Sequence, residues 1–290
     1  MSKFRNATDN QFVGFCVIRK ANLALTKTQK QYANLRVYDG NEEITGRIWD
    51  FTGSLPEENS VVKVKGIMGE FNGNSQITIS DWRPAKKGEY DPAEFLPAYK
   101  GNKNALYNNL AKHVDEIQNT NLKRMVDIII TTYTAGYYEA PAAKTHHHAY
   151  LGGLLEHTCS VVKMAKFLYE QHPEGADLDI VLAGAILHDL GKIEAYTWEG
   201  CSIDMSTKGK LVDHIPLGIM MLQPFLQQNE ISPEMQESLL HIVVSHHGYK
   251  EWGSPVEPAT KEAMIVHLAD LADGKLKKVT EKAEKEGISQ

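Results

Sequence analysis

The sequence is organised around the stretch Ala185-Ile186-Leu187-His188-Asp189-Leu190-Gly191-Lys192, where an adjacent histidine and aspartate end an apolar helix just before a glycine. Val181 and Ala185 share the helical face of His188, so this polar side chain starts from a surface that faces the core. A buried carboxylate without a partner costs on the order of several kcal/mol, and a divalent cation is an effective partner. The stretch therefore predicts the centre of a metal site.

Other apolar helices carry a histidine or aspartate at inward positions, where a plain helical core would have Leu or Ile. A His-Asp pair alone is more often structural than functional, so these companions decide the interpretation. Independently satisfied core histidines could explain one or two of them, but not all. The inward residues are His157, His214, His246 with the adjacent His247, and Asp270.

The order and spacing of these residues resemble those of the HD-domain metal-dependent phosphohydrolases. Within that family, the surrounding sequence is similar to a narrower group, the YhaM-type 3′-to-5′ exoribonucleases, over about residues 10–270. The segments that carry this second resemblance are Pro141-Ala142-Ala143-Lys144, Gly152-Gly153-Leu154, His188-Asp189-Leu190-Gly191-Lys192, Ser245-His246-His247-Gly248 and Glu251-Trp252-Gly253-Ser254-Pro255.

The HD resemblance implies a site for two divalent ions. One ion would be held by His157, His188, Asp189 and Asp270, and Asp189 would bridge to a second ion held by His214, His246 and His247. Imidazole and carboxylate ligands without thiolate suit Mn²⁺, Fe²⁺, Co²⁺ or Mg²⁺, and the resemblance to the YhaM group favours Mn²⁺. Such a pair of ions would activate water for attack on a phosphate.

Three further residues stand near these ligands in the sequence. Lys192 follows Asp189 within one turn and is a catalytic candidate that could contact a phosphate oxygen, or it simply compensates a helix dipole. By resemblance to the YhaM group, the segment His146-His147-His148 lines the substrate entrance, with His148 as the contributing residue. A surface loop is the alternative. His267, one turn before Asp270, is expected to support it by hydrogen bonding.

The first part of the chain, residues 11–83, has the periodicity of β-strands. Five runs, residues 12–18, 32–38, 43–50, 61–68 and 76–82, fit a small barrel. Asp39-Gly40 is a strong hairpin signal between the second and third runs, and Gly73-Asn74 supplies a turn before the fifth. In the second and third runs one face is apolar and the other carries arginine and aromatic side chains.

A five-stranded barrel with a cationic and aromatic face on its second and third strands indicates an oligonucleotide-binding (OB) fold. The YhaM resemblance, which also implies an N-terminal OB module, favours this interpretation. The expected nucleic-acid contacts are Arg36, Tyr38, Arg47 and Trp49, with Lys27 in a loop at the rim. The alternative is that Trp49 packs against the other domain and that the arginines are only solvated.

Residues 86–101 are rich in proline and glycine without a clear period, so they are expected to be a linker. The remainder, residues 102–290, is predicted to be helical, with helices over about 102–118 and 120–136 and from about 153, 178, 212, 234 and 258. We therefore expect a multidomain chain. It consists of an OB-fold barrel over residues 1–85, the linker, and an all-α HD domain over residues 102–290.

Charge and composition agree with a polymer-binding module joined to a catalytic one. Residues 1–90 contain 13 Lys/Arg and 10 Asp/Glu, whereas residues 91–290 contain 18 and 27, so the two parts carry +3 and −9. Cys16, Cys159 and Cys201 are far apart and lack a C-x-x-C spacing, which argues against disulfides and a thiolate zinc site. No apolar run is long enough to span a membrane, and a cytoplasmic location is expected.

The sequence thus predicts a metal-dependent hydrolase that releases nucleoside 5′-monophosphates from the 3′ end of single-stranded RNA, and of single-stranded DNA as a second substrate. One alternative is an HD phosphohydrolase of small nucleotides or cyclic phosphodiesters, whose barrel serves assembly only. A second is a non-enzymatic single-strand DNA-binding protein in which the ions stabilise the fold. Comparing the release of mononucleotides from an oligomer with the turnover of free nucleotides separates the first alternative from the prediction. Neither the oligomeric state nor the physiological RNA follows from the sequence.

Overall fold

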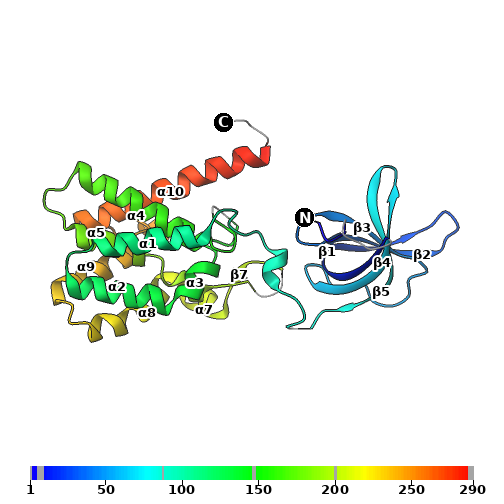
Figure 1. Ribbon diagram of the computed structural model, residues 1–290, viewed down its shortest axis with the longest axis horizontal. Helices are drawn as coiled ribbons and strands as arrows, with labels where there is room; N and C mark the ends of the chain where they lie inside the picture. Colours follow the sequence, from blue (N-terminus) through cyan, green and yellow to red (C-terminus); the bar gives the residue numbers. More distant parts are fainter. Residues whose placement is uncertain (1, 5–9, 87, 146–147, 199–200, 287–290) are drawn as a thin grey trace. The chain divides into compact units, whose positions relative to one another are not determined.

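The computed structural model describes residues 2–4, 10–86, 88–145, 148–198 and 201–286. The chain divides into two compact units, one formed by Met1–Pro97 with Trp198–Ser202 and the other by Ala98–Thr197 with Ile203–Gln290. The first unit is a closed β-barrel and the second is built from helices (Figure 1). The expected fold class, an OB-type barrel followed by a helical HD domain, is confirmed.

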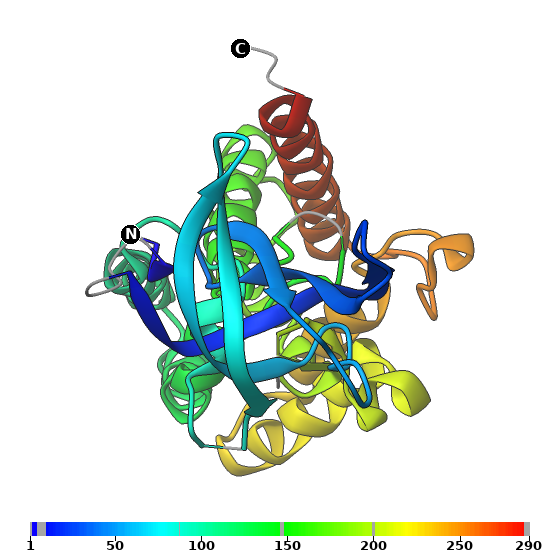
Figure 2. The same ribbon diagram turned by 90° about the vertical axis from the view of Figure 1, so that its right-hand side faces the viewer.

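The barrel contains five strands in the order β1-β2-β3-β5-β4, closed by pairing of β4 with β1 (Figure 2). The β3–β5 pair is parallel and the other pairs are antiparallel. This strand order is that of the OB-fold Greek key. The strands are β1 (Gln11–Leu25), β2 (Gln31–Tyr38), β3 (Glu43–Ile48), β4 (Val61–Phe71) and β5 (Asn74–Pro84).

Alternation along β2 and β3 sets the inside and the outside of the barrel. Leu35, Val37 and Ile44 are buried in its core, whereas Arg36 and Arg47 point to the opposite face. Side chains of period two must alternate between the faces of a strand, so the apolar set fixes the register. The cationic face predicted for the second and third strands is therefore present.

The first strand is longer than the sequence pattern predicted. Residues 12–18 were expected, but β1 continues to Leu25 because Val17 to Leu25 pair with β2 after a register shift between Ile18 and Lys20. Leu23 and Leu25 remain exposed in this extension. A two-stranded ribbon with apolar residues on its open face does not show the polar alternation that sequence analysis detects.

The helical unit is arranged around α5, all of whose residues from Ile180 onward are buried. Helix α5 contacts α1, α2, α4, α9 and α10, and α4 and α10 also pack against each other (Figure 1). The helices are α1 (Lys103–Glu116), α2 (Thr120–Thr132), α3 (Thr134–Glu139), α4 (Gly153–Gln171), α5 (Leu178–Leu187), α6 (Lys192–Ala195), α7 (Thr207–Val212), α8 (His214–Gln228), α9 (Pro233–Ser245) and α10 (Lys261–Glu286).

Most predicted helix starts lie within three residues of those in the structure. The helix expected over residues 120–136 is interrupted at Tyr133, where α2 ends and α3 begins. Short elements that no pattern announced include α6, α7 and the two-residue strand β6 (Tyr196–Thr197), whereas its partner β7 (Asp204–Met205) lies in the only strand-like run of the helical part, residues 201–205. Among the described residues, no helix combines the length and the apolar character needed to cross a membrane.

Candidate metal centre

Five helices of the second unit bring the predicted ligands together. Because α5 is apolar on all sides, it runs through the core and delivers the residues that follow it into the interior. Helix α9 also ends in buried residues, so that His246 directly after it lies in the interior. The ligand candidates are His157 in α4, His188 and Asp189 after α5, His214 at the start of α8, His246 and His247 after α9, and Asp270 in α10.

Two of these histidines are oriented by the helix that they follow. His188 Nδ1 lies 2.9 Å from the carbonyl oxygen of Ala185, and His246 Nδ1 lies 2.8 Å from that of Val243. A carbonyl oxygen only accepts, so Nδ1 must donate and Nε2 carries the lone pair. Each imidazole is therefore held in the tautomer that a metal ion binds, with Nε2 directed into the site.

The Asp189 carboxylate lies between two pairs of imidazole nitrogens. Its Oδ2 is 3.2 Å from His157 Nε2 and 3.3 Å from His188 Nε2. Its Oδ1 is 3.7 Å from His214 Nε2 and 3.5 Å from His246 Nε2. The residue is only 2% exposed. Each oxygen thus faces a different pair, which is the arrangement expected of a carboxylate that bridges two ions.

The donor atoms fit divalent ions. Among the described residues, Asp189 Oδ1 makes no hydrogen bond, and the same holds for the buried Nε2 atoms of His214 and His246. Buried polar atoms without partners are rare in native proteins. Two atoms bound to one ion at about 2.1 Å lie roughly 3.0–3.4 Å apart when they are adjacent ligands, and His157 Nε2 and His188 Nε2 are 3.2 Å apart.

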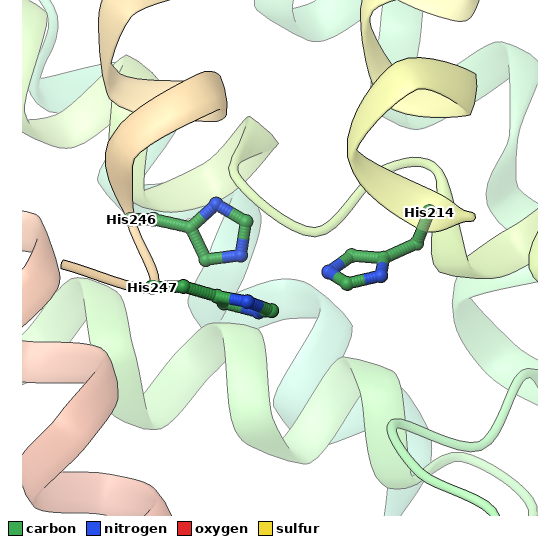
Figure 3. Close-up of side chains that lie close together, drawn as sticks. All are labelled: His214, His246 and His247. Atoms are coloured by element: carbon green, nitrogen blue, oxygen red, sulfur yellow. The ribbon is translucent and has the colours of Figure 1, made fainter. Parts of the chain in front are cut away.

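The second group consists of His214, His246 and His247, whose rings converge between the start of α8 and the end of α9 (Figure 3). His214 Nδ1 lies 2.7 Å from Asp213 Oδ1, and His247 Nδ1 lies 3.1 Å from the Trp252 carbonyl oxygen. With His246 oriented by α9, all three rings have Nδ1 engaged. Three Nε2 atoms are left to bind an ion.

Electrostatics keep these groups in the protonation states that bind metal. Burial would raise the pKa of the Asp189 carboxyl, but the neighbouring Lys192 ammonium and imidazoles hold this pKa well below its usual value. Burial lowers the pKa of both His214 and His246, and lowers the pKa of His247 to about 4. At neutral pH the carboxylate is therefore ionised and these three imidazoles are neutral.

Asp270 and Lys192 lie on either side of the first group. Asp270 Oδ1 is 3.2 Å from His157 Nε2, as a further ligand of the first ion would be. Lys192 Nζ is 2.6 Å from Asp189 Oδ2. The sequence allowed two roles for Lys192, contact with a phosphate and compensation of a helix dipole. In the structure it is the first residue of α6, and its ammonium contacts the Asp189 carboxylate.

A network behind His157 includes residues that sequence analysis missed. Asp273 Oδ2 lies 2.7 Å from His157 Nδ1 and 3.0 Å from His148 Nε2. Because a carboxylate accepts, His157 Nδ1 donates and its Nε2 faces Asp189 and Asp270. Asp273 follows Asp270 by three residues on α10, so helical spacing could have indicated it. His148, which also lies near Glu156, has no local signal.

The prediction that His148 contacts nucleic acid was wrong. Its side chain is buried, with the residue 1% exposed, and both ring nitrogens lie within hydrogen-bonding distance of carboxylates, Nδ1 of Glu156 and Nε2 of Asp273. The polar residue is buried because it fills the space between α4 and α10 and satisfies their acidic side chains. His146 and His147, from the same predicted segment, lie outside the described residues. His267 is also not bonded to Asp270 as expected, because its Nδ1 lies 2.8 Å from the carbonyl oxygen of His246.

A cavity of about 390 Å³ opens onto the ligands within the helical unit. His214, His247 and Asp270 line it on one side. Further lining residues are Lys192, Trp252, Lys275 and Lys278. We call this space the ligand-side pocket. It gives a molecule in the pocket direct access to both groups of proposed ligands.

In the barrel unit the predicted contacts fall into different environments. Trp49 follows the last residue of β3 and is 42% exposed. The Arg47 guanidinium lies 5.6 Å from the Trp49 ring. Arg36 is exposed but paired with Glu43 at 2.8 Å. Lys27 lies exposed in the turn between β1 and β2.

Tyr38 is more enclosed than expected. Its hydroxyl donates to the Gly40 carbonyl oxygen at 2.7 Å and its ring lies under the Arg19 guanidinium. Phe71, which the sequence analysis did not select, is 52% exposed at the end of β4, and the Arg47 guanidinium lies 5.0 Å from its ring. Arg47 and Phe71 line a second cavity of about 390 Å³ together with residues of β3 and β5.

Comparison with known proteins finds relatives over nearly the whole chain. The family model described as HD domain matches residues 154–274, which contain every proposed ligand. The 3′-5′ exoribonuclease YhaM of Oceanobacillus iheyensis is 32% identical over 274 residues, which cover 92% of this chain and 84% of that protein. YhaM of Bacillus subtilis is 29% identical over 266 residues, covering 90% and 84%.

Two other similarities are local. A family model described as "Putative helicase" matches residues 92–172, but the sequence contains no G-x-x-x-x-G-K-[ST] phosphate-binding loop that a helicase motor requires. A chain from a replication protein A heterotrimer bound to ssDNA is 26% identical to a part that covers 27% of this chain and 59% of that chain. Its TM-score of 0.23 is too low to indicate a shared fold.

Proposed function

Because this chain belongs to the family of the YhaM 3′-5′ exoribonucleases, we propose that it shortens single-stranded RNA from the 3′ end at the centre formed around Asp189. The protein is a hydrolase that acts on phosphodiester bonds, and the HD domain makes it dependent on divalent metal. The observation that carries the position of the site is the Asp189 carboxylate. Its two oxygens face separate pairs of imidazole nitrogens at 3.2–3.3 Å and 3.5–3.7 Å.

In the proposed centre Asp189 would be a ligand of both ions. The first would be held with His157, His188 and Asp270, and the second with His214, His246 and His247. Bound divalent ions supply a water nucleophile at neutral pH and stabilise the charge on the scissile phosphate. We propose Mn²⁺, because imidazole and carboxylate donors without thiolate suit it, although Fe²⁺, Co²⁺ and Mg²⁺ suit the same donors.

The protein's own groups orient this centre. Backbone carbonyls and carboxylates engage the Nδ1 atoms of the histidines, so that each Nε2 is fixed before an ion binds. Lys192 keeps the Asp189 carboxylate ionised and, from the wall of the ligand-side pocket, adds positive charge beside an incoming phosphate. Pre-oriented groups of this kind stabilise charge without reorganisation during the reaction.

The protein binds single-stranded nucleic acid, and we assign the polymer contact to the outer face of the barrel. Arg47 with Trp49 and Phe71 forms a cationic and aromatic surface on which bases can stack. Arg36 and Lys27 extend the positive charge around it. Stacking and phosphate contacts do not require a 2′-hydroxyl, so single-stranded DNA is proposed as a second substrate. An RNA substrate and three buried, unpaired cysteines support a cytoplasmic location.

The test is degradation of a 5′-labelled RNA oligomer in Mn²⁺, with a free or a blocked 3′ end. The free oligomer should be shortened stepwise to nucleoside 5′-monophosphates, and the blocked one should persist. Equal degradation of both would contradict attack from the 3′ end. Parallel incubation with free nucleotides and cyclic dinucleotides would reveal the rival activity, because an enzyme specific for small substrates would turn these over and leave the oligomer intact.

A further inference from the structure

The ligand-side pocket contains an aromatic residue that the metal chemistry does not use. Trp252 ends the short 3-10 helix η3 (Lys250–Trp252), is 50% exposed and lines the pocket beside His247. Tyr249 packs against it edge to face, with ring centroids 4.8 Å apart. A half-exposed tryptophan next to a phosphodiesterase centre offers an indole face to a flat ligand.

The loop that carries Trp252 is tied to the proposed ligands. The Trp252 carbonyl oxygen lies 3.1 Å from His247 Nδ1, so the same residue that lines the pocket orients a ligand of the second ion. Ser254 Oγ lies within hydrogen-bonding distance of the carbonyl oxygens of Val244 at 3.1 Å and Val256 at 2.7 Å, so its one hydroxyl proton is shared between them and holds the loop against α9. The loop backbone at Trp252 is therefore held in place relative to the proposed ligand His247.

Helix α10 contributes positive charge to the same pocket. Lys275 and Lys278 are exposed on α10 and line the pocket, and Lys275 Nζ lies 6.0 Å from the Trp252 ring centroid. Within the described part of the chain neither lysine makes an ion pair, whereas Lys277, between them in sequence, is paired with Glu156 at 2.8 Å. They follow Asp270 by five and eight residues, which is about 7.5 and 12 Å along the helix.

We propose that the ligand-side pocket is the subsite for the 3′-terminal nucleotide, whose base stacks on Trp252 while Lys275 and Lys278 neutralise the next phosphate toward the 5′ end. The inference rests on the proposed exonuclease function. The cavity of about 390 Å³ is at the small end of the range of ligand pockets, roughly 300–1,000 Å³. It therefore fits a single nucleotide better than a longer stretch of chain. Stacking is tolerant of sequence, because every base has a π face.

Binding of adenosine 5′-monophosphate and of ribose 5-phosphate, both in Mn²⁺, isolates the contribution of the base. Calorimetry on the full-length protein should show that the wild type binds the nucleotide about 5- to 100-fold more tightly, the factor expected from stacking one base. Trp252→Ala should abolish this difference without weakening the binding of ribose 5-phosphate. Trp252→Phe should retain most of it. Phe167→Ala, which removes an exposed aromatic residue from α4, is the matched control.

Two results would overturn the stacking role. The wild type could bind both ligands equally, or Trp252→Ala could weaken both by the same factor, which would mean that Trp252 only supports His247. For the lysines, Lys275→Ala with Lys278→Ala should leave adenosine 5′-monophosphate binding unchanged and weaken binding of a 5′-phosphorylated dinucleotide with a hydrolysis-resistant phosphorothioate linkage, because only its 5′-phosphate lies beyond the scissile position. Lys163→Ala, from the exposed face of α4, controls for loss of charge. An unchanged dinucleotide affinity would refute their assignment.

Failure of the proposed function would be recognised separately. A wild-type protein that discriminates between the two ligands but does not shorten an unblocked RNA oligomer would have the nucleotide subsite without the exonuclease activity. Conversely, stepwise degradation at equal rates of oligomers that end in a normal and in an abasic nucleotide would support the exonuclease activity and refute the base-stacking subsite.

Discussion

Replacing Asp189 by asparagine tests the bridging arrangement with almost no change in side-chain volume. An amide keeps one oxygen, but its nitrogen is not a metal ligand and the negative charge is lost. The second ion would then be left with three neutral imidazoles, His214, His246 and His247. Loss of a charged, buried ligand interaction is worth roughly 3–5 kcal/mol, and each 1.36 kcal/mol is about tenfold in rate. We therefore expect activity to fall by about 10²- to 10⁴-fold.

The metal content provides a readout that does not depend on activity. Wild-type protein equilibrated with Mn²⁺ and desalted should retain two ions per chain by elemental analysis, whereas Asp189→Asn should retain one or none. Circular dichroism would establish that the variant is folded, and Asp127→Asn, on the exposed face of α2, is the matched control because it makes the same chemical change away from the ligands. Two retained ions, or a rate within tenfold of wild type, would refute the bridging assignment.

Four further predictions concern other parts of the molecule. Trp49→Ala combined with Arg47→Ala should weaken oligomer binding by about 5- to 100-fold and flatten its salt dependence, while hydrolysis of bis(p-nitrophenyl) phosphate is spared; unchanged affinity and salt slope would argue against the barrel face. DNA oligomers should also yield 5′-monophosphates by mass spectrometry, and 2′,3′-cyclic phosphates from RNA would contradict attack by water. Asp273→Asn, which removes the acceptor of His157 Nδ1–H, should weaken Mn²⁺ binding by about 10- to 100-fold in a titration, as changes behind a ligand do. Burial lowers the pKa of His247 to about 4, so as pH decreases from about 6.5 the unfolded chain binds a proton at this residue before the folded chain does, and folding becomes less stable. The urea concentration at the unfolding midpoint of the metal-free protein should therefore decrease as pH is lowered from about 6.5 to about 4, and His247→Gln should make that decrease smaller.

The barrel and the ligand set could be predicted because their signals are local. Alternation in β2 and β3 is enforced by the pleat, so Leu35 and Val37 had to face inward and Arg36 outward. The His-Asp pair after α5 interrupts a helix that is otherwise apolar, and an ionisable pair in such a place is informative because its burial is costly. The family resemblance then supplied the grouping of ligands that spacing alone could not.

The orientation of each ligand depends on contacts that have no sequence period. His148 lies 125 residues from Asp273 in sequence, and only the packing of α4 against α10 brings them together. The same packing explains why the prediction for His148 failed. A histidine in a polar segment resembles a surface residue, yet the acidic residues Glu156 and Asp273 line the space behind His157 and require a buried donor. Removing one buried charge partner leaves the others uncompensated. A substitution at His148 or Asp273 is therefore expected to lower both the stability of the fold and the metal affinity of His157, whose Nδ1 this network engages.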